Sequence, residues 1–192
     1  MRPVILLFAK VPVAGHVKTR LIPRLGAEEA RSWYERLVRT GLAHLAKVAP
    51  VVLMTDRPTE AWPEFRGPRE LQGPGDLGMR MLAALERHLV TSHPVMIVGG
   101  DVPPPPRASL QDLLASPADV TLGPAVDGGF YAISCRRTTP SMFKGVVWSS
   151  GQERVQTERA CRRAGLSVVL GPPWFDVDTP EDLERARRLG IL

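Results

Sequence analysis

The sequence predicts an α/β protein with a mostly parallel central sheet and helices on both of its faces. Short, unbroken apolar runs recur along the chain, and Val4–Ala9 and Val95–Val98 are the clearest of them. Runs of this kind are typical of strands that helices cover on both sides. Segments with apolar residues at three- and four-residue steps lie between them and indicate helices. Alternation of strand and helix predicts parallel pairing of the strands.

In the first half of the chain, an apolar strand is followed by a long loop and then by a helical pattern. The loop, residues 10–21, carries Pro12, Gly15 and three cations. Asp76 is a suitable N-cap for a helix that runs to about residue 89. The expected strands of this half are 4–9, 51–54 and a short one near 70–72, and the expected helices are 27–48 and 77–89.

The second half continues the same alternation. Thr179 is placed to cap the last helix, with Pro180 in its first turn and acidic residues following. The expected strands are 95–98, 119–122, 130–133, 146–148 and 166–170, and the expected helices are 108–114, 151–164 and one from 180.

Length and composition predict one globular domain, residues 1–192. Hydrophobic residues make up 44% of the chain and charged residues 23%, which is ordinary for a globular protein. No apolar run approaches the ~18–20 residues of a membrane helix, and the first apolar run is too short for the core of a signal peptide. We therefore expect a cytoplasmic protein with no membrane partner.

The net charge of +5 indicates a polyanionic partner, either a nucleic acid or a nucleotide. The arginines of the expected helices alternate with acids, as on a solvated face. Aromatic residues make up only 6% and are not interleaved with the cations, whereas base stacking needs them. A nucleic-acid partner is therefore not expected. The sequence does not predict the oligomeric state.

The loop after the first strand is a candidate phosphate site. Phosphates bind at this position in many α/β sheets. Lys18 offers a point charge, and Arg20 offers a planar fork that can bind phosphate at two atoms. The loop matches neither the Walker A motif nor Gly-x-Gly-x-x-Gly. The alternative interpretation is a solvated basic loop.

Asp101 follows the central apolar run directly, after Gly99 and Gly100. This position lies beyond the carboxyl end of a strand, where open α/β sheets bind ligands. A carboxylate there is suited to hold Mg²⁺ or Mn²⁺, which prefer oxygen ligands. Asp176 and Asp178 precede the last helix cap, and one of them could supply a second ligand. The alternative for Asp101 is a capping role in the next turn.

Two glycine-rich segments have both a structural and a functional interpretation. Asp76 can act as a helix cap alone, but Gly78 inside the first turn costs ~1 kcal/mol against Ala. The glycines there leave room for a flat ligand. Asp127-Gly128-Gly129 can form a plain hairpin turn, or backbone that lies against a substrate.

Five motifs in this order resemble the bacterial glycosyltransferase-A-like, or CofC-like, family of the nucleotide-diphospho-sugar transferase superfamily. The similarity extends more distantly to molybdenum-cofactor nucleotidyltransferases and phospholactate guanylyltransferase. One departure is that Gly100 and Val102 flank the Asp where the family usually has Thr or Ser before it and Cys after it. The motifs are Phe8–Pro12 with Gly15 and Val17–Leu21, Gly75–Gly78 with Arg80-Met81, Gly100-Asp101 with Pro103, Gly123-Pro124 with Asp127–Tyr131, and Asp176–Leu183.

The resemblance implies a Rossmann-like GT-A fold and a site for each substrate. Asp101 and Asp178 would hold Mg²⁺ or Mn²⁺, and Asp101, Lys18 and Asp127 would be the catalytic residues. Asp127, Gly128 and Gly129 would line the acceptor side. The donor nucleotide would lie against Ala9, Lys10, Gly15, Lys18, Arg20, Gly75, Asp76, Gly78 and Arg80.

The leading hypothesis is therefore a Mg²⁺-dependent transferase that moves a nucleotidyl group from a nucleoside triphosphate to a phosphate- or hydroxyl-bearing small acceptor, releasing pyrophosphate. The first alternative is a glycosyltransferase that uses a nucleotide-sugar donor and the same metal site. The second is a nucleotide-binding module without catalysis. The products separate the first two, since glycosyl transfer releases a nucleoside diphosphate.

Overall fold

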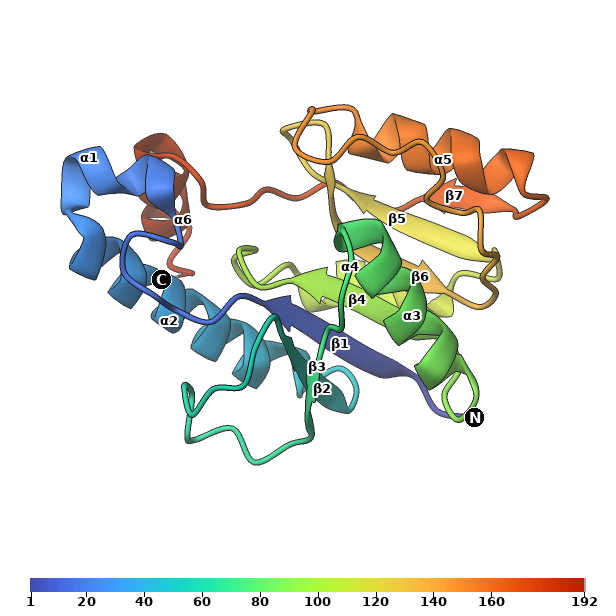
Figure 1. Cartoon of the computed structure of the whole chain (residues 1–192), viewed down its shortest axis with the longest axis horizontal. Coiled ribbons are helices and arrows are strands. Elements are labelled where there is room, and N and C mark those ends of the chain that lie inside the picture. The colour runs from blue at the N-terminus through green and yellow to red at the C-terminus, as the bar shows by residue number, and fades with distance from the viewer. Residues whose placement is uncertain (192) are drawn as a thin grey trace.

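The computed structural model describes residues 1–191 and contains a seven-stranded sheet with strand order β3-β2-β1-β4-β6-β5-β7 (Figure 1). The predicted α/β class is confirmed. The strands are β1 (Val4–Ala9), β2 (Val51–Thr55), β3 (Arg69–Leu71), β4 (Val95–Gly99), β5 (Val120–Pro124), β6 (Phe130–Cys135) and β7 (Val168–Leu170).

The sheet is mostly parallel, and β6 is the exception. β6 runs antiparallel to its neighbours β4 and β5, whereas the pairs β1–β2, β1–β4, β2–β3 and β5–β7 are parallel. No helix separates β5 from β6, because residues 125–129 form the tight connection that antiparallel strands allow. The alternation expected throughout the chain is therefore interrupted here.

Helices cover both faces of the sheet. Side chains of α2 and α4 belong to the core cluster on one face, and those of α3 and α5 to the cluster on the other. α6 packs against α2 through a third, smaller cluster. Within residues 1–191, none of the helices has the length and apolar character needed to span a bilayer. The helices are α1 (Ile22–Leu25), α2 (Ala27–Leu45), α3 (Leu77–Leu89), α4 (Arg107–Ala115), α5 (Glu153–Arg163) and α6 (Pro180–Arg188), with a 3₁₀ turn at Thr19–Leu21.

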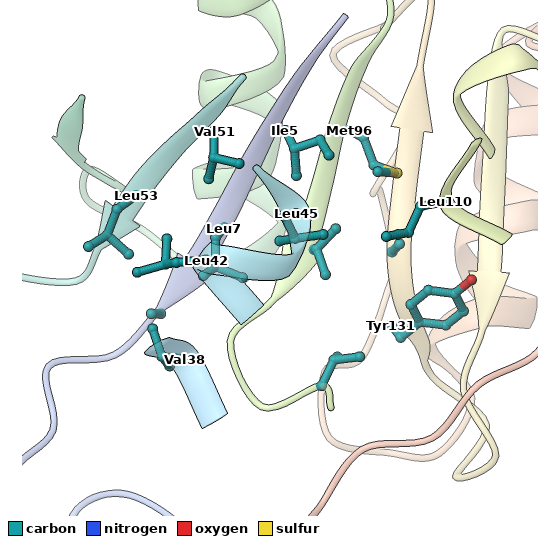
Figure 2. Packing of buried hydrophobic residues seen from close by; sticks show 14 of the residues in the cluster. Ile5, Leu7, Val38, Leu42, Leu45, Val51, Leu53, Met96, Leu110 and Tyr131 are labelled. Carbon is teal, nitrogen blue, oxygen red and sulfur yellow. The ribbon is translucent and has the colours of Figure 1, made fainter. Parts of the chain in front are cut away.

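β1 is buried along its whole length because it lies between β2 and β4 and both of its faces are covered. Ile5 and Leu7 point to the face that α2 covers, where Leu42 and Leu45 belong to the same cluster (Figure 2). Leu6 and other even-numbered residues of β1 point to the α3 face. This period of two explains why the strand reads as a continuous apolar run.

Two local expectations are corrected. Residues 146–148 are not a strand, since this segment pairs with no strand and Trp148 packs against Phe143, with ring centroids 5.9 Å apart. The loop expected over residues 10–21 ends in a 3₁₀ turn that leads into α1. In both places local composition was overridden by packing against neighbouring elements.

The predicted caps are confirmed. The Asp76 side chain accepts a hydrogen bond from the Met79 amide at the start of α3. Thr179 forms a capping box with Asp182 at the start of α6. These side chains satisfy backbone amides that the first helical turn leaves without partners.

We expect Leu7→Ala to destabilise the fold by about 2–5 kcal/mol, the range for truncating a fully buried leucine. Leu7 is 1% exposed and lies in register between Leu53 and Val98. Urea unfolding followed by circular dichroism measures the change. Val90→Ala is the control because Val90 is 72% exposed, and it should change the unfolding free energy by less than ~0.5 kcal/mol. Equal effects would contradict the assignment of β1 as the centre of the core.

Candidate functional site

A cleft of about 680 Å³ opens where the carboxyl ends of β1, β2 and β4 meet. Residues from both ends of the chain line it, including the loop after β1 and the segment before α6. Parallel strands place their carboxyl ends at one edge of the sheet, and this is the edge at which open α/β folds bind ligands. The cleft is therefore the candidate active site.

Lys18 is the buried cation of this cleft. Its Nζ lies 2.9 Å from Asp178 Oδ1 and 4.0 Å from Asp101 Oδ2, and its side chain is only 4% exposed. Its backbone has a left-handed conformation, with φ of 47°, which is uncommon for a residue with a side chain. Arg20 is 3.8 Å from Asp178 Oδ2, but its side chain is 74% exposed. Lys18 therefore joins two carboxylates from distant parts of the chain.

Backbone contacts bring Asp101 to its place. The Gly100 amide donates to the Phe8 carbonyl at 2.7 Å. A Cβ at Gly100 would lie 2.9 Å from that oxygen, so only glycine fits this approach. The Asp101 carbonyl accepts from the Val177 amide at 3.2 Å. The turn after β4 is thus fixed to both β1 and the segment that carries Asp176 and Asp178.

Asp176 is the least satisfied carboxylate of the cleft. Its Oδ1 is buried and has no hydrogen-bond partner within residues 1–191. Burial, together with the neighbouring charges of Asp101, Asp127 and Asp178, raises its pKa to about 8. Burial acts in the same direction on Asp178, but Lys18 and other cations hold its pKa below the ordinary value. Asp176 and Asp178, which are separated by one residue, thus have pKa values shifted in opposite directions.

The structure brings together some of the predicted site residues. The Asp127 side chain also accepts from the Gly129 amide, so the hairpin interpretation and the cleft position both apply to this turn. The predicted residues that line the cleft are Ala9, Lys10, Lys18, Arg20, Arg80, Asp101, Asp127, Gly129 and Asp178.

The other predicted residues do not line the cleft. Gly78 lies where a Cβ would approach Trp148 at 3.0 Å and Phe143 at 3.1 Å, so packing explains this glycine. Gly128 has a φ of 95°, and a Cβ there would overlap the carbonyl oxygen of Gly151. The residues outside the lining are Gly15, Gly75, Asp76, Gly78 and Gly128.

Sequence analysis did not predict Asp56, Tyr34 or Gln72 as residues of the cleft, which all three line. Asp56 was interpreted as a turn residue, yet its Oδ1 accepts from the Val11 amide at 2.6 Å. Tyr34 was assigned to the core, and its hydroxyl accepts from the Lys10 amide at 2.8 Å. Gln72 follows β3 and is 6% exposed. The sequence feature that could have indicated Asp56 and Gln72 as residues of the cleft is their position directly after β2 and β3.

One part of the cleft lining is apolar and aromatic. Phe130 and Trp148 both line the cleft, and their rings meet edge to face with centroids 6.3 Å apart. Leu77 and Met81 of α3 also line it. The cationic lining residues all belong to residues 10–20, apart from Arg80. The cleft therefore has a cationic part and a part formed by carboxylates and aromatic rings.

Within residues 1–191 there is no group of three or more His, Cys, Asp or Glu side chains arranged to hold a metal ion. In this arrangement the Lys18 ammonium lies near Asp101 and Asp178. The unpaired Oδ1 of Asp176 nevertheless faces a surplus of negative charge, which is an environment that favours a cation.

The fold is that of the nucleotide-diphospho-sugar transferases. A protein of Desulfovibrio desulfuricans G20, described as a "putative nucleotide-diphospho-sugar transferase", superposes with a TM-score of 0.89 at 32% identity, over 99% of this chain and 88% of that one. The inositol-1-phosphate CTP transferase of T. maritima superposes with a TM-score of 0.59 at 14% identity, over 95% and 91% of the two chains. This second similarity concerns the fold alone.

The sequence also identifies the family. Residues 40–150, more than half of the chain, match the family described as "Uncharacterized protein conserved in bacteria (DUF2064)", and the chain belongs to this family. It is also 29% identical over 180 residues to the 2-phospho-L-lactate guanylyltransferase of Haloarcula marismortui. The aligned residues cover 90% of this chain and 81% of that relative.

We expect Gly128→Ala to destabilise the protein more than Gly145→Ala. Both glycines have positive φ, 95° and 79°, so both substitutions carry the ~1–2 kcal/mol cost of the left-handed region. Only at Gly128 does the new Cβ also meet backbone, because Gly145 has nothing within 4 Å. Urea unfolding of the two variants measures the difference. Equal losses would show that the close approach of the 125–129 turn to Gly151 is not a constraint.

Proposed function

We propose that this protein is a metal-dependent nucleotidyltransferase, which transfers a nucleotidyl group from a nucleoside triphosphate to a small acceptor and releases pyrophosphate. The observation that carries the proposal is the arrangement of Lys18 between Asp101 and Asp178, near Asp176, whose buried Oδ1 has no hydrogen-bond partner among residues 1–191. Phosphoryl chemistry needs cations and a metal-binding carboxylate set in one water-excluding cleft. The name of the Haloarcula relative supports the same class of reaction.

The donor phosphates would lie along the loop after β1. Lys18 and Arg20 supply positive charge there, and Lys10 lies on the same side of the cleft. Their charge would stabilise the departing pyrophosphate, which carries more negative charge as its bond to the α-phosphate breaks. The remaining predicted residues of this side, Ala9 and Arg80, would border the nucleoside. Gly15, Gly75, Asp76 and Gly78 would shape the surrounding loops.

A divalent cation, Mg²⁺ or Mn²⁺, fits the carboxylate group by its charge and by its oxygen donors. Asp101 and Asp178 would hold it, and Asp176 is a third carboxylate able to take part because its Oδ1 has no other partner among the described residues. When bound, the cation would neutralise charge on the α-phosphate. Lys18 would keep Asp178 ionised, as its lowered pKa indicates.

The acceptor would enter beside Asp127, Gly128 and Gly129. Asp127 and Gly129 line the cleft. There Asp127 would orient the attacking phosphate or hydroxyl and, for a hydroxyl, accept its proton. Little covalent chemistry is asked of the chain, because positioning of the two substrates supplies much of the rate.

A glycosyltransferase is the second candidate, and the resemblance in fold to the Desulfovibrio protein favours it. The same cations and carboxylates would then stabilise a nucleoside diphosphate leaving group, while the acceptor attacks a sugar carbon. The two reactions share the cleft and differ in their products.

We expect Asp101→Asn to lower the rate of pyrophosphate release from nucleoside triphosphates by at least ~100-fold. Its melting temperature should stay near that of the wild type. Removing one preorganised charged group at a reacting centre costs about 10²–10³ in rate. The Asp101 side chain is 48% exposed, so the isosteric amide should be tolerated by the fold. Asp112→Asn on the exposed face of α4 is the matched control. An Asp101→Asn protein with full turnover would contradict the assignment.

Ligand-dependent melting separates the candidate functions. Nucleoside triphosphates and nucleotide sugars are each added with Mg²⁺ or with a chelator, and binding to the folded state raises the melting temperature. A Mg²⁺-dependent rise with a triphosphate is the expected result. A rise confined to nucleotide sugars would favour glycosyl transfer, and a metal-independent rise without product would favour a binding module that lacks catalysis.

A further inference from the structure

The start of α5 places a buried carboxylate in the cleft. Glu153 is the first residue of α5, is only 8% exposed, and lines the cleft. Its Oε1 accepts a hydrogen bond from the Ser150 amide at 2.6 Å, which satisfies an amide ahead of the first helical turn. Its Oε2 forms no hydrogen bond within residues 1–191. A capping role therefore accounts for one oxygen of this carboxylate and leaves the other for a ligand.

No cation of the described chain compensates this carboxylate. Within residues 1–191, no nitrogen of Lys, Arg or His lies within 4.0 Å of its oxygens, and the adjacent Arg154 pairs with Glu158 instead. A carboxylate that is buried without an opposite charge costs free energy, because the lost hydration is not replaced. The surroundings of Glu153 therefore favour a ligand that brings a positive charge.

The acceptor side of the cleft adjoins Glu153. The Arg154 amide donates to the Gly128 carbonyl at 3.2 Å, and a Cβ on Gly128 would overlap the carbonyl oxygen of Gly151. The start of α5 is therefore packed on the turn that carries Asp127. Asp127 lines the cleft as well, and it forms no ion pair within residues 1–191. Two carboxylates without cationic partners thus belong to this side of the cleft.

Aromatic rings complete the same part of the lining. Phe130 and Trp148 line the cleft together with Glu153, and the two rings contact each other edge to face. The face of an aromatic ring attracts an organic cation through its quadrupole. Mg²⁺ and Mn²⁺ instead need oxygen ligands around them, which rings do not supply. Carboxylates beside aromatic rings therefore suit an organic ammonium group better than a second metal ion.

The segment that carries Trp148 is held in place by its own hydrogen bonds. The Val147 amide donates to Gln156 Oε1 at 2.7 Å, and the Ser150 hydroxyl donates to the Val147 carbonyl at 2.6 Å. Ser149 lines the cleft and has a φ of 62°, which is uncommon for a residue with a side chain. Strained backbone of this kind clusters at ligand sites. The Trp148 ring is therefore positioned by contacts within the chain, without help from a ligand.

We propose that the acceptor carries an alkylated ammonium group, which pairs with the Glu153 carboxylate and lies against the rings of Trp148 and Phe130. The class is a small alcohol, or its phosphate ester, with this ammonium group on a short carbon chain. The proposal rests on the proposed function, since it names the acceptor of that same cleft. The acceptor oxygen would form a bond to the α-phosphorus as the bond to pyrophosphate breaks, and an alcohol would pass its proton to Asp127.

The test compares probes that have the same shape and differ in charge. Choline is paired with 3,3-dimethylbutan-1-ol, in which carbon replaces the nitrogen, and the phosphate esters of both alcohols form a second pair. Dissociation constants for the wild-type chain are measured by NMR titration with Mg²⁺ present. We expect the ammonium member of each pair to bind at least ~10-fold more tightly, because only it gains an ion pair and a cation–π contact.

Substitutions then test the two kinds of contact. Glu153→Gln keeps an oxygen that can accept from the Ser150 amide but removes the charge, so the ammonium preference should fall ~10-fold while the neutral probes bind as before. Trp148→Leu should reduce the same preference, and Trp148→Phe should retain most of it because a ring remains. Melting temperatures check that each variant is folded. Glu181→Gln is the matched control, since Glu181 is an exposed acid in the first turn of α6, and it should leave the preference unchanged.

The outcomes separate this proposal from the proposed function. Equal affinity for the charged and neutral probes, binding of neither, or an unchanged preference in Glu153→Gln would overturn the ammonium assignment. Loss of Mn²⁺ binding in Glu153→Gln would overturn it too, by showing that the carboxylate holds a metal ion. If a nucleoside triphosphate still binds with Mg²⁺ in these cases, nucleotidyl transfer stands and only the acceptor class fails. An ammonium preference without binding of any triphosphate would count against the proposed function, and with it against the acceptor role.

Discussion

The ion pair between Lys18 and Asp178 is the contact on which the cleft depends. It joins residues 160 positions apart, and Lys18 could not be 4% exposed without a carboxylate partner. An ammonium group without an opposite charge would pay a desolvation cost that the surrounding apolar residues cannot offset. The pair therefore holds the loop after β1 against the segment before α6, and both of its residues line the cleft.

The same contact accounts for the electrostatic division of the cleft. Lys18 lowers the pKa of Asp178, whereas burial and three neighbouring carboxylates raise that of Asp176. Charge in this region is thus only partly compensated by the described residues. A site with this imbalance favours an additional cation, close to the loop after β1.

The antiparallel strand β6 gives the cleft its second side. A parallel strand beside β4 would begin at the opposite edge of the sheet, whereas the antiparallel β6 begins at the edge where β4 ends. Because β5 is parallel to β7 and β6 returns antiparallel beside β4, the 125–129 turn lies at the carboxyl edge. Gly128 then permits close contact with Gly151, which fixes the turn against the segment that enters α5. Asp127 and Trp148 reach the cleft for this reason.

The sequence by itself determined the α/β class, most helices and strands, and the helix caps at Asp76 and Thr179. It also indicated Lys18 and Asp101 as candidate site residues. Periodicity, capping residues and strand ends are local signals, which the sequence alone carries. Tertiary structure alone decided that residues 146–148 pack against α3 without pairing, since strand pairing needs a neighbour that no local pattern specifies. It also decided that Gln72 donates to the carbonyls of Ala9 and Met54, that Asp56 accepts from the Val11 amide, and that Asp176 Oδ1 is buried without a hydrogen-bond partner among residues 1–191. Each of these depends on groups distant in sequence, whose positions only the closed fold sets.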